Sequence, residues 1–511
     1  MLAKILSSAV LGIDAYIVEV EADISQQLPS FATVGLPDGA VKEAKERVAA
    51  AIKNSDFIYP NKKITINLAP ADIRKEGSAF DLPMAVGILA ATGQILRDRF
   101  DDFVMVGELS LDGTLKPVPG ILPIALQIAK TEKRALIVPR ENAMEAAITN
   151  ELDVYPLDNL SDTVNFLETG NTVEPFKVDV DEVFNQATHY PTDFLDVKGQ
   201  EVAKRALEVA AAGGHNIIMI GPPGSGKTML AKRLPSILPS LTMEEALEIT
   251  KIHSVAGLLK ANTALIATRQ FCAPHHTISD AGLIGGGRMP KPGQVSLAHH
   301  GLLFLDEMPE FRKDILEMLR QPMEDGQVTI SRSMISLTYP SQFMLVGAMN
   351  PCPCGFFGDN NHDCTCNPGQ IQKYMSKISG PLLDRIDIHI EVPAVKFKEL
   401  AGEPTGEKSD AIRLRVNKAR MIQLERFSGE TNMYCNAHME SRDLQKYCPL
   451  ENRSMELLRM AITKLGLSAR AYDRIIKVAR TIADIEEEPN ILPGHISEAI
   501  QYRSLDRNLW M

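Results

Sequence analysis

The chain has 511 residues, of which 45% are hydrophobic and 23% are charged, and its formal net charge is −11. At about 100–200 residues per domain, this length predicts about three domains. The ordinary composition excludes collagen-like, disordered and disulfide-scaffold proteins. The acidic balance argues against a protein that coats nucleic acid or anionic membranes with its whole surface, although a local basic patch remains compatible with it.

The chain starts with an apolar run, MLAKILSSAVLGIDAYIVEV, that a secretory signal peptide would also have. Asp14 interrupts this run and apolar alternation continues beyond it, so the pattern favours a first β-strand. No uninterrupted apolar stretch reaches the length of about 18 residues that a membrane span needs. Seven cysteines, four of them within residues 352–366, indicate a reducing compartment with a metal site or free thiols. We therefore expect a cytoplasmic protein with no membrane partner.

Residues 1–175 alternate strand-like and helix-like segments. The expected elements are strands over 15–24 and 63–73 around a helix over 40–54, an apolar helix over 81–96, a hairpin over 104–118 with Asp-Gly at its turn, and a strand followed by a helix over 135–148. These elements predict a compact α/β domain without a glycine-rich phosphate-binding loop.

The rest of the chain divides into three parts. Residues 176–193 are acidic and poorly periodic, which predicts a linker. Residues 194–395 have the pattern of a second α/β unit. Residues 396–511 have almost entirely helical composition after a loop rich in Gly, Glu and Pro at 401–410.

A glycine-rich loop, GPPGSGKT, occupies residues 221–228. It follows the apolar run 216–220 and precedes a helix-like segment, which is the context that the G-x-x-x-x-G-K-[ST] motif requires. Its glycines let backbone N–H groups point at phosphate oxygens, Lys227 reaches the terminal phosphates, and Thr228 ligates Mg²⁺. ATP and Mg²⁺ are thus the expected cofactors, and the candidate binding residues are Gly221, Pro222, Pro223, Gly224, Ser225, Gly226, Lys227 and Thr228.

Two further apolar segments end in polar residues. GLLFLDE (301–307) has the composition of a parallel strand buried on both faces, with function at its carboxyl end. We expect Asp306 to orient the Mg²⁺ shell and Glu307 to act as general base toward the attacking water. QFMLVGAMN (342–350) places the amide of Asn350 where it can position the water or sense the γ-phosphate.

The order of loop, acidic strand and asparagine resembles that of the AAA+ ATPase family. In this resemblance Arg385, within SGPLLDRIDI, matches the arginine finger that reaches a neighbouring subunit's nucleotide. Arg470, within GLSARAYDRIIKVAR, matches the second sensor on a helical lid, and FLDVKGQ (194–200) matches the adenine pocket. The alternative for both arginines is an ordinary surface or ion-pair contact. Because a guanidinium suits phosphate charge, the functional interpretation is favoured.

The resemblance extends over essentially the whole chain. GQVTISRSMISLTYP (326–340) resembles the hairpin that precedes the first sensor in magnesium-chelatase and replicative-helicase relatives, and residues 273–307 resemble the chelatase-type insert. With GLPDGAVKEAKERV (35–48) and NLAPADIRKEGSAFDLP (67–83), the chain resembles the YifB/ComM family. The resemblance implies a homo-oligomeric, hexameric ring that hydrolyses ATP to move DNA. Its implied role is that of a helicase or branch-migration factor in recombination and natural transformation, with recombination proteins as partners.

The first domain resembles the Lon-protease type of the ribosomal S5 domain 2-like fold, which implies a Ser/Lys dyad. The sequence departs from that pattern, since Ala79 takes the nucleophile position and Ser78 lies one residue early. Apolar residues, including Leu122 and Ile124, stand where the lysine is needed. A serine without a nearby base is a weak nucleophile. We therefore expect no peptidase activity, and a docking or DNA-contacting role instead.

Four cysteines have C-x-C-x9-C-x-C spacing, namely Cys352, Cys354, Cys364 and Cys366. Four thiolates suit a closed structural Zn²⁺ site, with His362 as a substitute ligand. The alternative is a set of reduced surface cysteines. The remaining cysteines are expected to be packing residues, and the adjacent histidines are expected to point to opposite faces of strands and so to form no metal site: Cys272, Cys435, Cys448, His275, His276, His299 and His300.

Candidate DNA contacts come from local positive charge. GGGRMPKPG (285–293) carries Arg288 and Lys291 without an acid, and the hairpin carries Arg332. In a ring like that of the relatives, both segments would face the channel, where backbone-tracking contacts need such charge. A structural role for them is the alternative. The basic segment 413–426 is expected to be a solvated helix face.

Two other functions remain open at this stage. One is the ATPase subunit of a metal chelatase, similar to magnesium chelatase subunit I, against which the extra N-terminal domain argues. The other is a protein-remodelling AAA+ ATPase, whose turnover would respond to proteins and not to DNA.

Overall fold

The computed structural model describes residues 2–95, 100–131, 135–170, 173–188, 190–260, 263–287, 289–332, 335–359, 362–395, 406–430, 433–465 and 468–503. The chain divides into two compact units. The first, called here the N-terminal unit, comprises Met1–Thr188 and Met243–Ala267, and the second, called the core unit, comprises His189–Thr242 and Thr268–Met511. None of the described helices combines the length and apolar character needed to cross a lipid bilayer.

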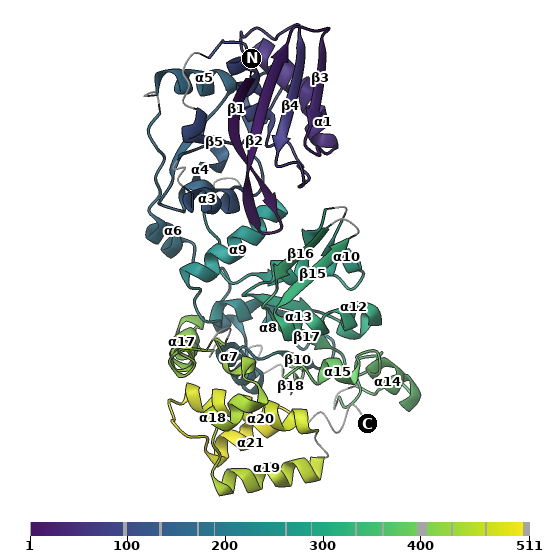
Figure 1. Cartoon of the computed structure of the whole chain (residues 1–511). Helices are drawn as coiled ribbons and strands as arrows, with labels where there is room; N and C mark the ends of the chain where they lie inside the picture. The colour runs from purple at the N-terminus through teal and green to yellow at the C-terminus, as the bar shows by residue number, and fades with distance from the viewer. Residues whose placement is uncertain are drawn as a thin grey trace. The chain divides into compact units, whose positions relative to one another are not determined.

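The N-terminal unit is built on a seven-stranded mixed sheet ordered β3-β4-β2-β1-β5-β8-β9. β1 pairs antiparallel with β2, and β2 pairs antiparallel with β4, whereas β1, β5, β8 and β9 run parallel. Figure 1 shows the long β1–β2 hairpin beside β4 and β3. The expected first strand is therefore confirmed. The strands are β1 (Leu2–Leu11), β2 (Asp14–Ser25), β3 (Ser30–Val34), β4 (Lys63–Ala69), β5 (Phe103–Met105), β8 (Ala135–Pro139) and β9 (Asp153–Leu157), with a short hairpin of β6 (Glu108–Leu109) and β7 (Leu115–Lys116).

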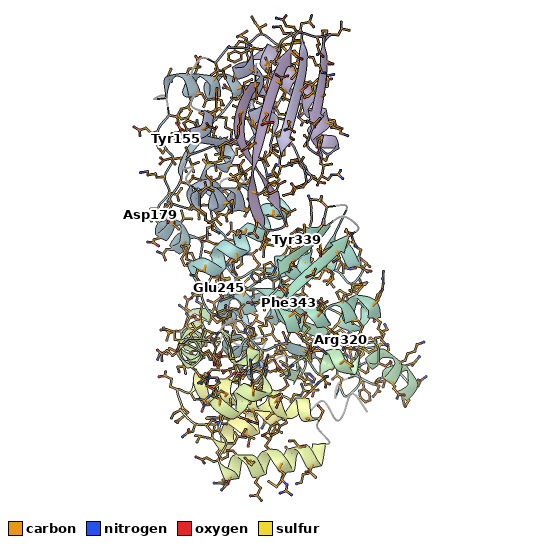
Figure 2. The ribbon with its side chains drawn as sticks, viewed as in Figure 1. Tyr155, Asp179, Glu245, Arg320, Tyr339 and Phe343 are labelled. Atoms are coloured by element: carbon orange, nitrogen blue, oxygen red, sulfur yellow. The ribbon has the colours of Figure 1, made fainter. Side chains whose placement is uncertain are left out.

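The helices of this unit include the three that the sequence pattern predicts, over 40–54, 81–96 and within 135–148, and others that it does not. All residues of α2 are buried, which explains why this helix is apolar all round. Arg47 of α1 donates from Nε to Asp81 Oδ2 at 2.6 Å, so an ion pair ties α1 to the start of α2. Tyr155, labelled in Figure 2, lies 4.6 Å from Phe166 between ring centroids. The helices are α1 (Gly39–Asn54), α2 (Asp81–Ala91), α3 (Ile121–Ala129), α4 (Ala143–Ala147), α5 (Leu160–Thr169), α6 (Val180–Gln186) and α9 (Met243–Ala256).

Two segments differ from the organisation that the sequence pattern suggests. The expected linker contains α6, which begins with Asp179 accepting a hydrogen bond from Glu182 N. Residues 243–267, which lie between elements of the core unit along the chain, belong to the N-terminal unit. There α9 packs against α3, and Ser254 donates to the buried carboxylate of Glu145 at 2.5 Å. Packing between segments so distant in the chain cannot be predicted from local hydrophobic periodicity.

The core unit contains a five-stranded parallel sheet ordered β11-β14-β17-β10-β18. The chain enters at β10, crosses to β11 at the far edge, returns through β14 and β17, and finishes with β18 on the other side of β10. The carboxyl ends of parallel strands meet at one edge, and ligands bind there where the strand order reverses. The expected α/β class with a parallel sheet is thus confirmed. The strands are β10 (Ile217–Ile220), β11 (Phe271–Cys272), β14 (Leu302–Leu305), β17 (Met344–Met349) and β18 (Ile388–Glu391).

Two small antiparallel ribbons extend from this sheet. β15 (Gln327–Arg332) and β16 (Ile335–Pro340) form the expected hairpin, and β12 (Gly285–Gly286) pairs with β13 (Lys291–Pro292). Tyr339 of β16, labelled in Figure 2, donates its hydroxyl hydrogen to Pro290 O at 2.6 Å. One buried hydrogen bond therefore anchors the hairpin to the loop that precedes β13.

Helices make up most of the remaining core unit. Those before β18 are α7 (Glu201–Gly213), α8 (Lys227–Arg233), α10 (Asp280–Leu283), α11 (Gln294–Leu297), α12 (Lys313–Met318), α13 (Arg320–Asp325), α14 (Pro368–Met375) and α15 (Gly380–Leu383). Those after it, green to yellow in Figure 1, are α17 (Ser409–Arg426), α18 (Ser441–Tyr447), α19 (Asn452–Leu465), α20 (Ala469–Ile485) and α21 (Pro493–Gln501).

A buried polar network joins the C-terminal helices to the sheet. Asp387, just before β18, accepts hydrogen bonds from Arg474 of α20 at 2.6 Å and from His215 at 3.2 Å. His215 Nε2 lies 2.8 Å from Thr481 Oγ1. Burial alone would raise the pKa of Asp387, but the charge of Arg474 and the hydrogen bond from His215 hold it well below its usual range.

Asn216, the residue before β10, hydrogen-bonds to β17 on one side and to the turn before β18 on the other. Its Oδ1 accepts from Leu345 N at 2.8 Å, and its Nδ2 donates to Arg385 O at 3.1 Å. We predict that Asn216→Ala destabilises the core unit by about 1–3 kcal/mol, because it leaves a buried backbone donor and an acceptor unpaired. Thermal unfolding and hydrogen exchange over β17 measure the effect.

Asn216→Asp is the matched control for this prediction. The carboxylate still accepts from Leu345 N but cannot donate to Arg385 O, so exchange at Leu345 should stay protected. An alanine variant with unchanged unfolding temperature and unchanged exchange over β17 would contradict the structural role.

Candidate functional site

The glycine-rich loop 221–228 joins β10 to α8 at the carboxyl edge of the core sheet. Gly224 and Gly226 have φ values of +74° and +90°, a region that other residues rarely adopt. A Cβ on Gly221 would lie 2.1 Å from Val392 O, so this position also excludes a side chain. The three glycines let the loop curl around the first turn of α8, where backbone N–H groups have no partner within the helix.

Lys227 folds back over this loop. Its Nζ donates to Gly221 O at 2.7 Å, to Pro222 O at 2.9 Å and to Asn350 Oδ1 at 3.3 Å. The residue is only 8% exposed. Burial lowers the pKa of Lys227 to about 8, and the charge of Asp306 only partly opposes the shift. A desolvated ammonium of this kind is poised to bind an anionic group.

Thr228 and Asp306 bring two oxygen atoms together beside the lysine. Thr228 Oγ1 donates to Asp306 Oδ2 at 2.7 Å. Hydroxyl and carboxylate oxygens are the ligands that Mg²⁺ uses next to phosphates. The donor set at this point therefore fits the expected cation.

Glu307 has an unusual backbone conformation for a side-chain-bearing residue. Its φ of 50° and ψ of 44° place it in the left-handed region, and its N–H donates to Asp306 Oδ1 at 3.0 Å. This conformation costs about 1–3 kcal/mol and is concentrated at functional sites. The carboxylate is 60% exposed, and its Oε2 lies 3.9 Å from Nδ1 of His276. The turn thus presents the carboxylate to solvent next to an imidazole.

One cavity of about 420 Å³ collects these groups. Its volume lies within the range of about 300–1,000 Å³ that small-molecule sites occupy. Of the expected nucleotide residues, Gly221 and Pro222 shape the loop without lining the cavity. The lining residues are Pro223, Gly224, Ser225, Gly226, Lys227, Thr228, Met229, Asp306, Glu307, Met349 and Asn350.

The structure also adds residues that the motifs did not identify. Met229 and Met349 contribute apolar lining. Gln200, which has a left-handed φ of 58°, donates from Nε2 to Ser225 O and thus holds the loop from the segment expected to line the adenine pocket. His276, for which a structural or nucleotide-relay role is expected, faces Glu307. The sequence feature that could have identified His276 as a site residue is its position shortly after the edge strand β11. This position points to the site only once β11 is known to pair with β14, the strand before Glu307.

Arg385 and Arg470 are not among the described residues that line the cavity. Arg385 is nearly buried, donates from Nη1 to Pro381 O at 2.6 Å and pairs with Glu324. Arg470 is 64% exposed and pairs with Asp384 at 3.2 Å. The two arginines therefore meet at one turn, because Asp384 is the residue before Arg385.

The four expected metal-ligating cysteines converge in the structure. Their Sγ atoms all lie within 4.8 Å of one another. Cys352 is 3.3 Å from Cys354 and 3.7 Å from Cys364, and Cys354 is 3.6 Å from Cys364. Zn–S bonds of about 2.3 Å in a tetrahedron separate neighbouring sulfurs by about 3.8 Å. The donor set therefore fits Zn²⁺. His362 instead contacts Asp359, with Nδ1 3.2 Å from Oδ2.

The expectation that adjacent histidines point to opposite faces of strands is wrong. The rings of His275 and His276 lie 4.1 Å apart, and those of His299 and His300 lie 3.8 Å apart. Both pairs occupy turns, and His300 has a left-handed φ of 52°, so strand alternation does not apply to them.

The three cysteines outside the group of four have different environments. Cys448 is buried and packs as expected. Cys435 is also buried. Burial alone would raise the pKa of its thiol, but the charge and hydrogen bond of His438, together with the charges of Arg420 and His215, lower it to about 6. The partly exposed Cys272 lies in β11, where burial raises the pKa of its thiol to about 12.

Lys291 and Arg332, two of the expected DNA-contacting residues, are exposed. Arg332 ends β15, Lys291 lies in β13, and Arg288 lies outside the described residues. A Cβ on Gly286 would lie 3.2 Å from Arg332 Nη2, so the guanidinium reaches the loop 285–293. Since Gly286 pairs with Lys291 in the β12–β13 ribbon, Arg332 lies close to the strand pair that carries Lys291. In contrast, basic residues of α17 make ion pairs, among them Arg415 with Glu208 at 2.6 Å.

The departures from a protease dyad are visible in the N-terminal unit. Ser78 donates to the carboxylate of Glu108, a residue that the motif comparison did not include. Leu122 and Ile124 are buried apolar residues of α3. The position expected to supply a lysine is therefore part of a hydrophobic core.

Comparison with protein families places three models along the chain. The model described as "Magnesium chelatase, subunit ChlI" matches residues 193–400. "Subunit ChlI of Mg-chelatase" matches residues 20–142, and "Magnesium chelatase, subunit ChlI C-terminal" matches residues 406–503. The matches thus cover parts of both compact units.

Similar proteins extend over the whole chain. The competence protein ComM of Haemophilus influenzae is 44% identical over 99% of this chain and 98% of its own length. YifB of Escherichia coli is 43% identical over the same shares of the two chains. A magnesium-chelatase 67 kDa subunit of Chlorobaculum parvum is 29% identical, over 31% of this chain and 23% of its own.

The lowered pKa of Lys227 predicts how nucleotide affinity depends on pH. As pH rises through about 8, the free ammonium loses the proton that attracts phosphate, so affinity for MgATP should fall, by at most about tenfold per pH unit. Equilibrium titration with a fluorescent ATP analogue between about pH 7 and pH 9 measures the dependence.

Lys227→Arg and Thr228→Ala separate this effect from other titrating groups. The arginine stays protonated, so its affinity should be independent of pH over this interval even if it is weaker. Thr228→Ala should keep the wild-type pH dependence. An arginine variant with the same pH dependence as the wild type would show that another group titrates.

Proposed function

Because the chain belongs to the YifB/ComM family of magnesium-chelatase-like ATPases, we propose that it is an ATP-hydrolysing AAA+ ring motor that acts on DNA. The observation that carries the ATPase assignment is the cavity shared by Lys227, Thr228, Asp306, Glu307 and Asn350. The proposed role is that of a cytoplasmic helicase or branch-migration factor in recombination and natural transformation. Its support is the similarity to a protein named for competence.

Within this proposal each polar group has one task. Lys227 binds the terminal phosphates. Thr228 and Asp306 would hold Mg²⁺, which would neutralise phosphate charge. Glu307 takes the proton of the attacking water, since its carboxylate is exposed at the cavity. Asn350, already tied to Lys227, orients the water or the γ-phosphate. These assignments require a nucleotide and Mg²⁺ in the cavity.

Arg385 is proposed to act as an arginine finger on the nucleotide of a neighbouring subunit in a hexamer, and Arg470 as the second sensor on the helical lid. Both lie at the turn around Asp384, and neither is among the described residues lining the cavity of its own chain. A guanidinium supplied from the next subunit would complete the charge balance of phosphoryl transfer. The ion pair between Arg385 and Glu324 would then have to open on assembly.

The domain assignments are part of the same proposal. Residues 1–175 are interpreted as a Lon-like, S5 domain 2-like module without peptidase activity that docks partners or DNA. Residues 176–193 are interpreted as a linker, residues 194–395 as the AAA+ core, and residues 396–511 as a helical lid. The proposed nucleic-acid contacts are Lys291, Arg332 and Arg288.

The metal-chelatase alternative receives less support. The chelatase subunit is similar over 31% of this chain, whereas the ComM protein is similar over 99%. Recovery of a large porphyrin-binding partner with the purified chain would favour the chelatase function. Turnover that rises with a protein and not with DNA would favour remodelling.

Glu307→Gln tests the proposed base. The amide keeps the size of the side chain but cannot accept a proton, so ATP binding should persist while turnover falls by about 10²–10⁴-fold. Phosphate release and equilibrium binding of an ATP analogue measure the two quantities. Lys227→Ala should instead weaken binding itself, because it removes the ammonium from the cavity.

Glu310→Gln is the matched control for the base. This neighbouring carboxylate pairs with Lys377 at 3.2 Å and is not among the lining residues, so its variant should turn over at the wild-type rate. Normal turnover in Glu307→Gln would remove Glu307 from the mechanism.

ATPase activity titrated against DNA tests the motor assignment. We expect single-stranded or forked DNA to raise turnover, and we expect a Lys291→Ala/Arg332→Ala variant to bind DNA more weakly and with a reduced salt dependence, by about one unit of slope per lost phosphate contact. Measurements at two salt concentrations separate this electrostatic effect from others.

Lys446→Ala provides the control for charge alone. Lys446 pairs with Glu430 at 2.9 Å on α18, and its loss should leave DNA stimulation unchanged. Turnover that is indifferent to every DNA structure, without strand separation or branch migration, would overturn the helicase function while leaving the ATPase assignment in place.

A further inference from the structure

The cysteine cluster, defined as Cys352, Cys354, Cys364 and Cys366, lies against the phosphate-binding loop. Gly355, the residue after Cys354, has a left-handed φ of +89°. A Cβ at this position would lie 2.5 Å from Pro223 Cδ and 2.7 Å from Pro223 Cγ. There is no room for a methyl group between the cluster and the loop. Any displacement of the cluster toward the cavity would therefore push on Pro223, which lines it.

The same cluster is tied at both ends to Asn350. Cys352 follows Asn350 after one proline, and the buried Cys352 side chain anchors that end. Cys366 precedes Asn367, which caps α14 by accepting a hydrogen bond from Gln370 N at 2.9 Å. On α14 the buried Tyr374 hydrogen-bonds to the backbone of Asn350. The chain before Cys352 and the helix after Cys366 therefore both contact or contain Asn350, the residue that contacts Lys227.

The four thiols need a cation to stay together as thiolates. All are free cysteines, and their Sγ atoms lie within 4.8 Å of one another, so four negative charges would repel strongly. A divalent ion in a closed tetrahedral site removes this repulsion and orders the chain that supplies its ligands. The donor set of four sulfurs selects Zn²⁺ over the oxygen-preferring cations.

We propose that the cysteine cluster binds a structural Zn²⁺ and that occupancy of this site sets nucleotide affinity, through the contact of Gly355 with Pro223 and the positioning of Asn350. The inference rests on the proposed function to the extent that the affected ligand is ATP. The zinc ion takes no part in hydrolysis. The ion fixes the cysteine cluster and Gly355, which packs against Pro223 of the phosphate-binding loop. Loss of the ion lets Pro223 and Asn350 move, and this weakens nucleotide binding.

Metal content of the purified full chain tests the site itself. Elemental analysis should find one zinc ion per chain, and Cys354→Ser/Cys364→Ser, which removes one ligand from each arm, should find almost none. Cys272→Ser, outside the cluster, should retain the metal. Iron in place of zinc, the absence of bound metal, or full zinc content in the double variant would overturn the site.

Nucleotide affinity of zinc-loaded and zinc-free protein tests the coupling without relying on turnover. The protein is stripped with a chelator, Mg²⁺ is restored to every sample, and binding of a fluorescent ATP analogue is titrated. We expect removal of zinc to weaken binding by about tenfold or more, and re-addition of Zn²⁺ to restore it. Unchanged affinity in zinc-free protein that remains folded by circular dichroism would overturn the coupling.

A pair of glycine variants tests the contact even if the cysteine variants fail to fold. Gly355→Ala should keep its zinc ion but bind the analogue several-fold more weakly, because the new methyl group displaces Pro223. Gly358→Ala carries the same strain, with a φ of +79°, but has no neighbour within 4 Å, so it should bind the analogue more tightly than Gly355→Ala does. Equal affinity in the two variants would overturn the role of the contact.

The outcomes also separate this inference from the proposed function. Wild-type protein that holds zinc but binds no nucleotide would overturn the ATPase assignment and, with it, the coupling, whereas the zinc count would still stand. Wild-type protein that binds nucleotide equally well with and without zinc would overturn only the coupling.

Discussion

The desolvated ammonium of Lys227 is the group on which the rest of the site depends. It stays inside the loop because four acceptors replace the water it has lost: two loop carbonyls, the Ser225 hydroxyl and the amide oxygen of Asn350. A buried charge without such partners would be strongly destabilising. Two constraints fix these acceptors: the loop is shaped by glycines in left-handed conformations, and Asn350 directly follows the end of β17. The site is therefore preorganised before any phosphate arrives.

The carboxyl edge of the parallel sheet supplies the remaining geometry. β10 delivers the loop, β14 delivers Asp306 and Glu307, and β17 delivers Asn350, and these three strands are neighbours in the sheet. The strained conformation of Glu307 is stabilised by the hydrogen bond between its N–H and Asp306. On the other side of β10, Arg470 and Arg474 of α20 form ion pairs with two aspartates in the turn before β18. The polar cavity residues after β14 and β17 therefore lie on one side of β10, and the contact with α20 lies on the other side.

Much of this arrangement was predictable from local sequence. GPPGSGKT, the apolar strand ending in Asp306 and Glu307, and the strand ending in Asn350 identify themselves by composition and order, because a strand buried on both faces must be continuously apolar. The four cysteines were predictable as a group from spacing alone. Other features were not: His276 faces Glu307 only because β11 is adjacent to β14, and the packing of α9 on α3 in the N-terminal unit depends on contacts between segments distant in the chain.

The sequence by itself determined the family, the α/β class, and the residue types available for phosphate, magnesium and thiolate chemistry. The α/β class and the available residue types follow from short-range patterns, such as periodicity and motif spacing, whereas the family follows from similarity over the whole chain. Only the tertiary structure decided that Arg470 pairs with Asp384 beside Arg385, and that Gly355 closes on Pro223. Both are contacts between segments separated by 86 and by 132 positions (470 minus 384, and 355 minus 223). Close packing at that range depends on how whole elements fit, which no local pattern encodes.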